Sequence, residues 1–456
     1  MLTSLLFAAN AGANGAFPEV SQLVADPAVA THLVLRSNFG LLTTQDSGQT
    51  WDLVCEGGIG YQNIEPPVAL LDDGSTIAAL ATGIAHGDPS ACNFGVAAGV
   101  DTYVADVSRV PSRPGHAVAV SVDIAGNTSQ VWQSADDGAT WTTFGASIAN
   151  LNAATLDVTA DDPNTVYVTG TAQSDTLSGV LARSSDGGQT WTRDDVPGAN
   201  KVSAPYIAAI SPSDDATVYV RLSGTPGRLL VTHDSGAHFD DILDFTGPFD
   251  GFALSPDGQS VLASGRVDGV WRAPTASLAF EQLSCAKLRC LSWTASGLFA
   301  CADEFEAGFL VGQSTDEGLS FEPLLHLSCL RGPLACPSST SVGAVCPAAW
   351  PAISEQLGTD CASAASFMPS TVCRDAGSAS DAATAQPDSS TPNDSGSPTA
   401  GEPSISTSAA ALTPRGGCGC VAAGRGALPS VWLSLLSLGL CWFGHSFRRS
   451  RRARRC

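Results

Sequence analysis

Lysine, histidine and the short motifs of common cofactor sites are scarce in this sequence. Lysine occurs only at Lys201 and Lys287, and seven histidines are scattered over 456 residues. No two cysteines have the C-x-x-C spacing, so a structural zinc site has no support. Glycine-rich phosphate loops and the G-x-S-x-G pattern of serine hydrolases are absent too. We therefore expect neither a metal ion nor a cofactor.

Positive charge is also in short supply before the C-terminus. The chain carries a formal charge of −22, and the residues from Gly416 onward contain seven arginines and no acid. Residues 1–415 therefore carry −29. A body this acidic repels phosphate backbones and anionic lipids, so nucleic acid is excluded as an expected partner.

Cysteine, in contrast, is frequent, with 14 in the chain. Thiols in this number without a metal motif indicate disulfides formed in an oxidising compartment. The sequence leaves their connectivity open. Ten of them form the candidate set: Cys55, Cys92, Cys285, Cys290, Cys301, Cys329, Cys336, Cys346, Cys361 and Cys373.

Both ends of the chain have the composition of targeting segments. Residues 1–16 hold a short apolar run followed by A-x-A sites, as in a signal peptide without its basic region, so we expect the natural start to lie upstream. The alternative is a buried N-terminal strand. Residues 375–415 are poor in large apolar side chains and predict a disordered stalk. Residues 427–447 are apolar enough to form a transmembrane helix, and an arginine-rich tail follows.

Residues 416–456 combine "GGCGC", the apolar segment and the arginine tail. This combination resembles the MYXO-CTERM sorting signal of myxobacteria and their relatives. The resemblance implies recognition by a sorting protease at the membrane and delivery to the cell surface, with Cys418 or Cys420 as the position of processing or lipidation. The alternative is a plain single-span anchor. In both cases we expect an exported envelope protein.

One motif recurs five times, each time as a hydroxyl residue, an Asp two positions later, a Gly two after that and an aromatic three further on. "SSDGGQTW" (184–191) is one copy. The gaps of 90 and 82 residues between some copies each accommodate one degenerate repeat, and the unit is then about 45 residues long. The motif residues are Asp46, Gly48 and Trp51; Asp136, Gly138 and Trp141; Asp186, Gly188 and Trp191; Asp234, Gly236 and Phe239; and Asp316, Gly318 and Phe321.

Seven such units predict an all-β fold, a seven-bladed propeller of four-stranded blades over residues 17–330. The motif resembles the Asp-box, or BNR, repeat of sialidases, sortilin and xyloglucanase-type glycoside hydrolases. In that family the box is a structural hairpin. Physical reasoning agrees, because an Asp acceptor beside a Gly suits a tight turn and the aromatic offers a large area to bury. Tyr167 and Tyr219, at matching places in two repeats, are predicted to lie in the core.

Three specific functions of the acidic residues, namely calcium binding, sialidase activity and glycoside hydrolysis, find little support in the sequence. A calcium loop needs several converging oxygens, and Asp186 is followed only by glycines. Sialidase activity needs an arginine triad and a Tyr-Glu pair, and the early arginine motif of that family is absent. Glycoside hydrolysis needs two facing carboxylates. The acids outside the repeating positions are the candidates: Glu56, Glu65, Asp101, Glu304 and Glu306.

Residues 331–374 follow the last expected blade and are rich in cysteine, with a predicted short helix at "PAAWPAISEQLG" (347–358). A disulfide-stapled cap on the propeller is the favoured interpretation, because such a segment has little core of its own. A separate recognition module is the alternative.

The expected function is binding or display of an unknown surface protein or glycan by a monomeric propeller, without catalysis. A carbohydrate-active enzyme is the second hypothesis, and a scaffold for envelope proteins is the third.

Overall fold

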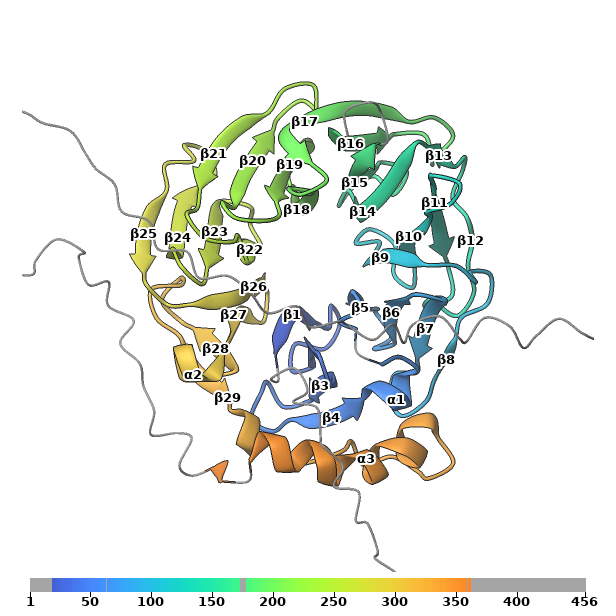
Figure 1. The fold of residues 1–456 in the computed structure, drawn as a ribbon, viewed down its shortest axis with the longest axis vertical. Coiled ribbons are helices and arrows are strands. Elements are labelled where there is room, and N and C mark those ends of the chain that lie inside the picture. The colour runs from blue at the N-terminus through green and yellow to red at the C-terminus, as the bar shows by residue number, and fades with distance from the viewer. Residues whose placement is uncertain (1–18, 63, 173–177, 359, 362–456) are drawn as a thin grey trace, which may run out of the picture. The chain divides into compact units, whose positions relative to one another are not determined.

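The computed structural model describes residues 19–62, 64–172, 178–358 and 360–361. Within these residues, seven antiparallel sheets stand in a ring (Figure 1). Each sheet has four strands in sequence order from the centre outward, and in the third a short extra strand also pairs with β11. The prediction of an all-β seven-bladed propeller is confirmed.

The strands are assigned to blades 1 to 7 as follows. Blade 1 holds β1 (Val20–Ala25), β2 (Leu33–Ser37), β3 (Gly40–Thr44) and β4 (Asp52–Cys55), and blade 2 holds β5 (Val68–Leu70), β6 (Thr76–Leu80), β7 (Gly83–Gly87) and β8 (Phe94–Val96). Blade 3 holds β9 (Val104–Arg109), β10 (Ala117–Asp123), β11 (Thr128–Ser134), β12 (Thr142–Thr143) and β13 (Ile148–Ala149). Blade 4 holds β14 (Leu151–Val158), β15 (Val166–Ala172), β16 (Ser178–Ser184) and β17 (Thr192–Asn200), and blade 5 holds β18 (Pro205–Ser211), β19 (Asp214–Leu222), β20 (Arg228–Thr232) and β21 (Asp240–Asp244). Blade 6 holds β22 (Gly251–Leu254), β23 (Ser260–Gly265), β24 (Gly269–Pro274) and β25 (Glu281–Ser284), and blade 7 holds β26 (Leu288–Thr294), β27 (Gly297–Ala302), β28 (Val311–Ser314) and β29 (Glu322–Leu325).

The second strand of each blade is buried on both faces, because each blade lies between two others. This explains why these strands are nearly continuous apolar runs instead of alternating apolar and polar residues. Tyr167 and Tyr219 are buried on β15 and β19, as predicted. The Tyr167 hydroxyl donates to the Asp215 carbonyl oxygen at 2.8 Å, which connects blade 4 to blade 5.

The segment after blade 7 closes the ring by running along the outer strand of blade 1. The amide of Leu53 on β4 donates to the Gly332 carbonyl at 2.7 Å, and the Leu334 amide donates to the Leu53 carbonyl at 2.8 Å. The helix α3 (Ser341–Leu357) then lies against the outside of the ring beside α1 (Glu56–Ile59) (Figure 1). It starts six residues before the predicted helix, because the Thr340 hydroxyl accepts from the Gly343 amide and caps its first turn.

Disulfides attach this segment to the first two blades. Cys55–Cys346 joins β4 to α3, and Cys92–Cys336 joins the turn before β8 to the start of the segment. Cys329–Cys361 and Cys290–Cys301 are the other two pairs within the described residues. Cys285 is also disulfide-bonded, and Cys373 lies outside the described residues. The predicted disulfides of an oxidising compartment are thus present.

Two further helices are short: α2 (Glu304–Ala307) and the 3₁₀ helix η1 (Leu327–Cys329). Among the described residues, none of the helices has the length and apolar character needed to cross a membrane. Several predictions lie outside the described residues: the N-terminal segment 1–16, the stalk 375–415, the sorting segment 416–456 with Cys418 and Cys420, and its helix 427–447.

Candidate functional site

The five repeated motifs form the turns between the third and fourth strands of their blades. In blade 4, the Ser184 hydroxyl donates to Asp186 Oδ1 at 2.8 Å. The Thr190 amide donates to the same oxygen at 2.9 Å, and the Thr190 hydroxyl donates to Oδ2 at 2.6 Å. These bonds, the Thr190 hydroxyl first, lower the pKa of Asp186 from 3.8 to about 2. The same arrangement surrounds Asp46, Asp136, Asp234 and Asp316, except that the His238 ring replaces the second hydroxyl at Asp234.

The glycine of each motif lies against the preceding blade. Gly188 has φ of +78°, and a Cβ there would come 2.5 Å from the Phe144 carbonyl oxygen of blade 3. Both the backbone angle and the close approach therefore require glycine. The motif aromatics are buried or half-buried, and those of blades 1 and 3 donate their indole N–H to the motif glycine carbonyl. The motif glycines Gly48, Gly138, Gly188, Gly236 and Gly318 lie next to Leu324, Ile77, Phe144, Leu181 and Leu262, respectively.

Replacing Asp186 by Ala is expected to lower the melting temperature by roughly 2–4 °C, because the turn loses three accepted hydrogen bonds. The pKa of Asp186 is depressed in the fold, so this stabilisation is present above pH 3.8 and is lost as the pH falls toward about 2. Thermal melts at pH 7 and pH 2.5 measure both effects. Asp161→Ala, which removes an exposed acid with no hydrogen bond among the described residues, is the matched control. Equal melting temperatures of the two variants at pH 7 would contradict the structural role.

The five acids proposed as hydrolase candidates do not form a site. Glu304 accepts from the Leu327 amide at 2.7 Å and contacts His326, and Glu306 pairs with Lys287 at 2.9 Å. Asp101 is exposed and Glu56 lies on α1. Only Glu65 approaches the centre of the ring, where its carboxylate accepts from the Ser21 hydroxyl. None of the five faces another across a cavity that both line.

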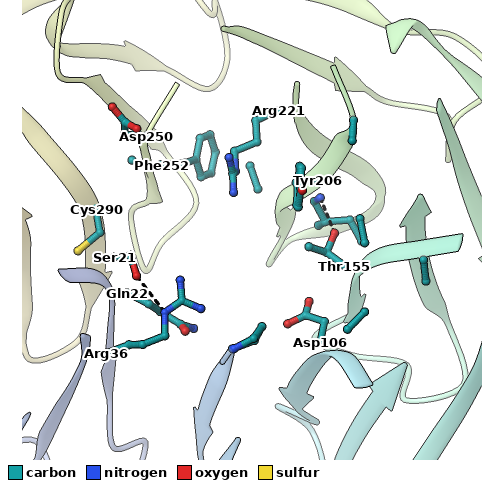
Figure 2. Close-up of a pocket in the computed structure, with 18 of the residues that line it drawn as sticks. Ser21, Gln22, Arg36, Asp106, Thr155, Tyr206, Arg221, Asp250, Phe252 and Cys290 are labelled. Atoms are coloured by element: carbon teal, nitrogen blue, oxygen red, sulfur yellow. Dashed lines mark hydrogen bonds between the residues drawn. The ribbon is translucent and has the colours of Figure 1, made fainter. Parts of the chain in front are cut away.

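A cavity of about 690 Å³ lies at the centre of the ring (Figure 2). Its size is in the range of small-molecule sites. The inner strands supply most of its lining. The polar residues of the whole lining are Ser21, Gln22, Arg36, Tyr103, Asp106, Asn152, Thr155, Thr171, Lys201, Tyr206, Arg221 and Asp250.

Much of this lining comes from equivalent positions of the repeat. The hydroxyl residue of each motif ends the third strand of its blade and pairs with a residue of the second strand. Three positions further along the second strand lies a residue that pairs with a cavity-lining residue of the first strand. The pairs, in blades 1, 3, 4, 5 and 7, are Arg36 with Gln22, Val120 with Asp106, Thr169 with Thr155, Arg221 with Tyr206, and Cys301 with Cys290. Two blades thus place arginine where the others have a neutral residue.

Arg36 points into the cavity from blade 1 (Figure 2). Its Nε donates to the Ser21 hydroxyl at 3.0 Å, and that hydroxyl donates onward to Glu65. Partial burial lowers the pKa of Arg36, an effect that Glu65 and Asp106 oppose through their charge. Among the described residues, no carboxylate forms a direct ion pair with it.

Arg221 points into the same cavity from blade 5 (Figure 2). Its guanidinium lies over the Tyr206 ring, 4.7 Å from the centroid, and this cation–π contact fixes its direction. Burial lowers its pKa as well. Arg221 likewise has no ion-pair partner among the described residues. Blades 1 and 5 are as far apart in the ring as two of seven blades can be, so the two arginines approach the cavity from across it.

Lys201 and two carboxylates complete the charged lining. Asp106 on β9 accepts from the amides of Val107 and Leu156, both at 3.0 Å. Burial raises its pKa to about 7, and the nearby Asp157 adds to the effect. Asp250 is neutralised by Arg266, whose Nε and Nη2 donate to its two oxygens at 3.0 and 3.2 Å.

Within the part of the chain that the structure describes, no three His, Cys, Asp or Glu side chains gather as metal ligands would. The cavity lining is instead polar and partly cationic. This set suits the recognition of a polar or anionic organic molecule.

Sequence reasoning missed both arginines. The signal that could have found them is a difference between two strands that otherwise match. Residues 166–169 read VYVT in blade 4, and residues 218–221 read VYVR in blade 5. An arginine at the end of a buried strand, where the repeat has a neutral residue, indicates a departure from the scaffold.

Comparisons with known proteins agree with the fold and extend no further. No protein-family model and no curated protein matches the chain. Among solved structures, an ancestral GH74 enzyme matches at a TM-score of 0.52 and 16% identity, over 67% of this chain and 46% of that one. Hydrazine synthase from Kuenenia stuttgartiensis matches at 0.48 and 10% identity, over 68% and 98%. A GH74 xyloglucanase from Xanthomonas campestris matches at 0.27 and 13% identity, over 67% and 69%.

This chain therefore spans about half the length of the ancestral GH74 enzyme. At this identity the likeness shows a propeller fold and does not transfer an activity.

Proposed function

We propose that this protein is a surface-displayed binding propeller that holds a protein or glycan ligand in its central cavity, without chemical turnover. One observation carries the proposal. The repeating residues build the scaffold, whereas the cavity concentrates polar residues that differ from blade to blade. A rigid ring with a variable polar centre is a suitable frame for recognition.

The same proposal assigns the flanking segments and the repeats. The turn motifs are Asp-box, or BNR, repeats that stabilise the blades. Residues 416–456 are a MYXO-CTERM-type signal that delivers the protein to the cell surface and anchors it there at least transiently, and the propeller acts as a monomer. The disulfides support export, because such bonds persist in oxidising compartments.

Filling the cavity tests the binding site. Ala154 lines it, and Ala154→Trp is expected to weaken ligand binding at least tenfold by occupying the space. The measurement is binding of the purified full-length protein to arrays of glycans and of envelope proteins. Ile124→Trp, which adds the same side chain at an exposed turn, is the control and should bind as the parent does. Ligands that bind both variants equally well would show that the cavity is not the site.

A second candidate, glycoside hydrolysis, is favoured by the two carboxylates that line the cavity. Asp106 has a pKa raised to about 7, as a general acid requires, and Asp250 lines the same cavity and pairs with Arg266 at 3.0 Å. Two carboxylates in different surroundings are the requirement of this chemistry. Reducing-end release from polysaccharides, lost in both Asp106→Asn and Asp250→Asn but kept in Asp161→Asn, would establish the enzyme and remove the binding-only function.

A further inference from the structure

We propose that Arg36 and Arg221 form a carboxylate site, and that the ligand of the central cavity is a glycan carrying an acidic sugar. This inference rests on the proposed function, because it names the ligand class of the same cavity.

The first argument is the unmet charge of the two arginines. Guanidinium groups that are partly removed from water ordinarily pair with a carboxylate. Arg36 instead donates to Ser21, and Arg221 lies on Tyr206. Each also repels the other, since the charge of Arg221 is among the causes that lower the pKa of Arg36. An anion between them would supply the missing partner and relieve this repulsion.

An arginine has many possible carboxylate partners in so acidic a chain. The −29 body of residues 1–415 offers many carboxylates, and five other arginines pair with them, whereas Arg109, Arg113, Arg183 and Arg193 form no ion pair among the described residues. Arg289, for example, pairs with Glu19 at 2.8 Å. Among the described arginines without an ion pair, Arg36 and Arg221 are the two that line the cavity.

The planar guanidinium indicates which anion fits. Its N–H groups match the two oxygens of a carboxylate, and the site can address that group from two sides because the arginines approach from blades 1 and 5 (Figure 2). A polyanion is disfavoured because the acidic body repels it at long range. A ligand with one carboxylate on an otherwise neutral frame fits the charge distribution best.

The remaining lining indicates a hydroxylated frame. Gln22, Asn152, Thr171 and Tyr206 offer hydrogen-bonding groups around the arginines, and Phe252 adds an aromatic ring. Sugars bind through hydrogen bonds to their hydroxyls and through contacts of their C–H faces with aromatic rings. The combination therefore favours an acidic sugar over an acidic peptide, which would need apolar pockets for its side chains.

Three matched sugars test this inference. Cellobiouronic acid carries one carboxylate, its methyl ester hides that charge, and cellobiose lacks the carboxyl group. We expect the full-length protein to bind cellobiouronic acid at least tenfold more tightly than either neutral sugar in calorimetric titrations. Arg36→Gln and Arg221→Gln should each remove this preference, while Arg272→Gln, which changes an arginine on the outer strands of blade 6, should keep it. Melting temperatures establish that every variant is folded.

Each result that contradicts the inference has its own consequence for the cavity and its ligand. Equal binding of the three sugars, with loss in Ala154→Trp, would overturn the carboxylate site and leave the cavity as the binding site. Tighter binding of glucose 6-sulfate than of the uronate would assign the arginines to sulfate and overturn the inference, as would binding of a peptide carboxylate alone. No binding of any sugar would overturn it too, and the array screen with Ala154→Trp would then decide the proposed function separately.

Discussion

Replacing Cys55, Cys92, Cys336 and Cys346 together by serine is expected to lower the free energy of unfolding by about 4–6 kcal/mol. The two disulfides close loops of 291 and 244 residues, and cross-links over long loops restrict the unfolded chain most. They also hold the last described segment against blades 1 and 2. Without them, the segment is held by backbone bonds such as Leu53 N–H to the Gly332 carbonyl, by the Arg331–Asp52 ion pair and by the apolar packing of α3.

Thermal and denaturant unfolding of the full-length protein measure this effect. A loss of this size corresponds to roughly 10–20 °C in melting temperature. Serine replacement of Cys290 and Cys301 is the control, because that pair closes a loop of only 11 residues and should cost about half as much or less. A four-serine variant as stable as the parent would show that attaching the segment through these disulfides does not stabilise the ring.

Binding of an acidic sugar is expected to strengthen on the order of tenfold as the pH falls from 8 to 6. Asp106 carries the effect. Its pKa is raised to about 7, so it is negative above that pH and neutral below it, and only the negative form repels a carboxylate in the cavity. The charged groups that face Asp106 are Arg36 from β2, Arg221 from β19 and Asp157 from β14. Both arginines keep their charge over this range, and the uronate stays ionised.

Calorimetric titrations of cellobiouronic acid at several pH values measure this dependence. In Asp106→Asn the affinity should be nearly independent of pH and close to the low-pH affinity of the parent. Cellobiose binding should not change between pH 8 and 6, because the neutral sugar feels no repulsion. An unchanged pH profile in Asp106→Asn would show that another group controls the charge of the cavity.

The scaffold could be predicted from the sequence because its chemistry repeats. The bonds that the Ser184 hydroxyl and the Thr190 amide donate to Asp186 recur with the same spacing in five blades, and a local turn of this kind needs no long-range contact to be recognised. The burial of Tyr167 and Tyr219 follows from their matching places in two strands. Repetition thus predicted which residues are structural.

The cavity could not be predicted in the same way. Arg36 and Arg221 are separated by 185 positions, and only closure of the ring directs them into one space. Asp106 lies in an inner strand between ordinary apolar residues, and its unusual pKa comes from burial that the sequence does not display. The candidate hydrolase acids show the converse, because of the five only Glu65 approaches the centre and a position outside the repeat does not by itself place a residue there.

The segment that follows blade 7 could be predicted only in part. Its cysteines predicted a stapled cap, but their partners could not be chosen, since pairing depends on which blade edge the chain meets. The structure brings Cys346 to Cys55 and Cys336 to Cys92 because residues 331–334 extend along β4.

A crystal structure of the full-length protein with cellobiouronic acid is the most direct test of the binding site. We expect the sugar in the central cavity, with its carboxylate oxygens within about 3 Å of guanidinium nitrogens of Arg36 and Arg221. A sugar bound on the outer strands, or bound centrally with its carboxylate turned away from both arginines, would contradict the site proposed for this propeller.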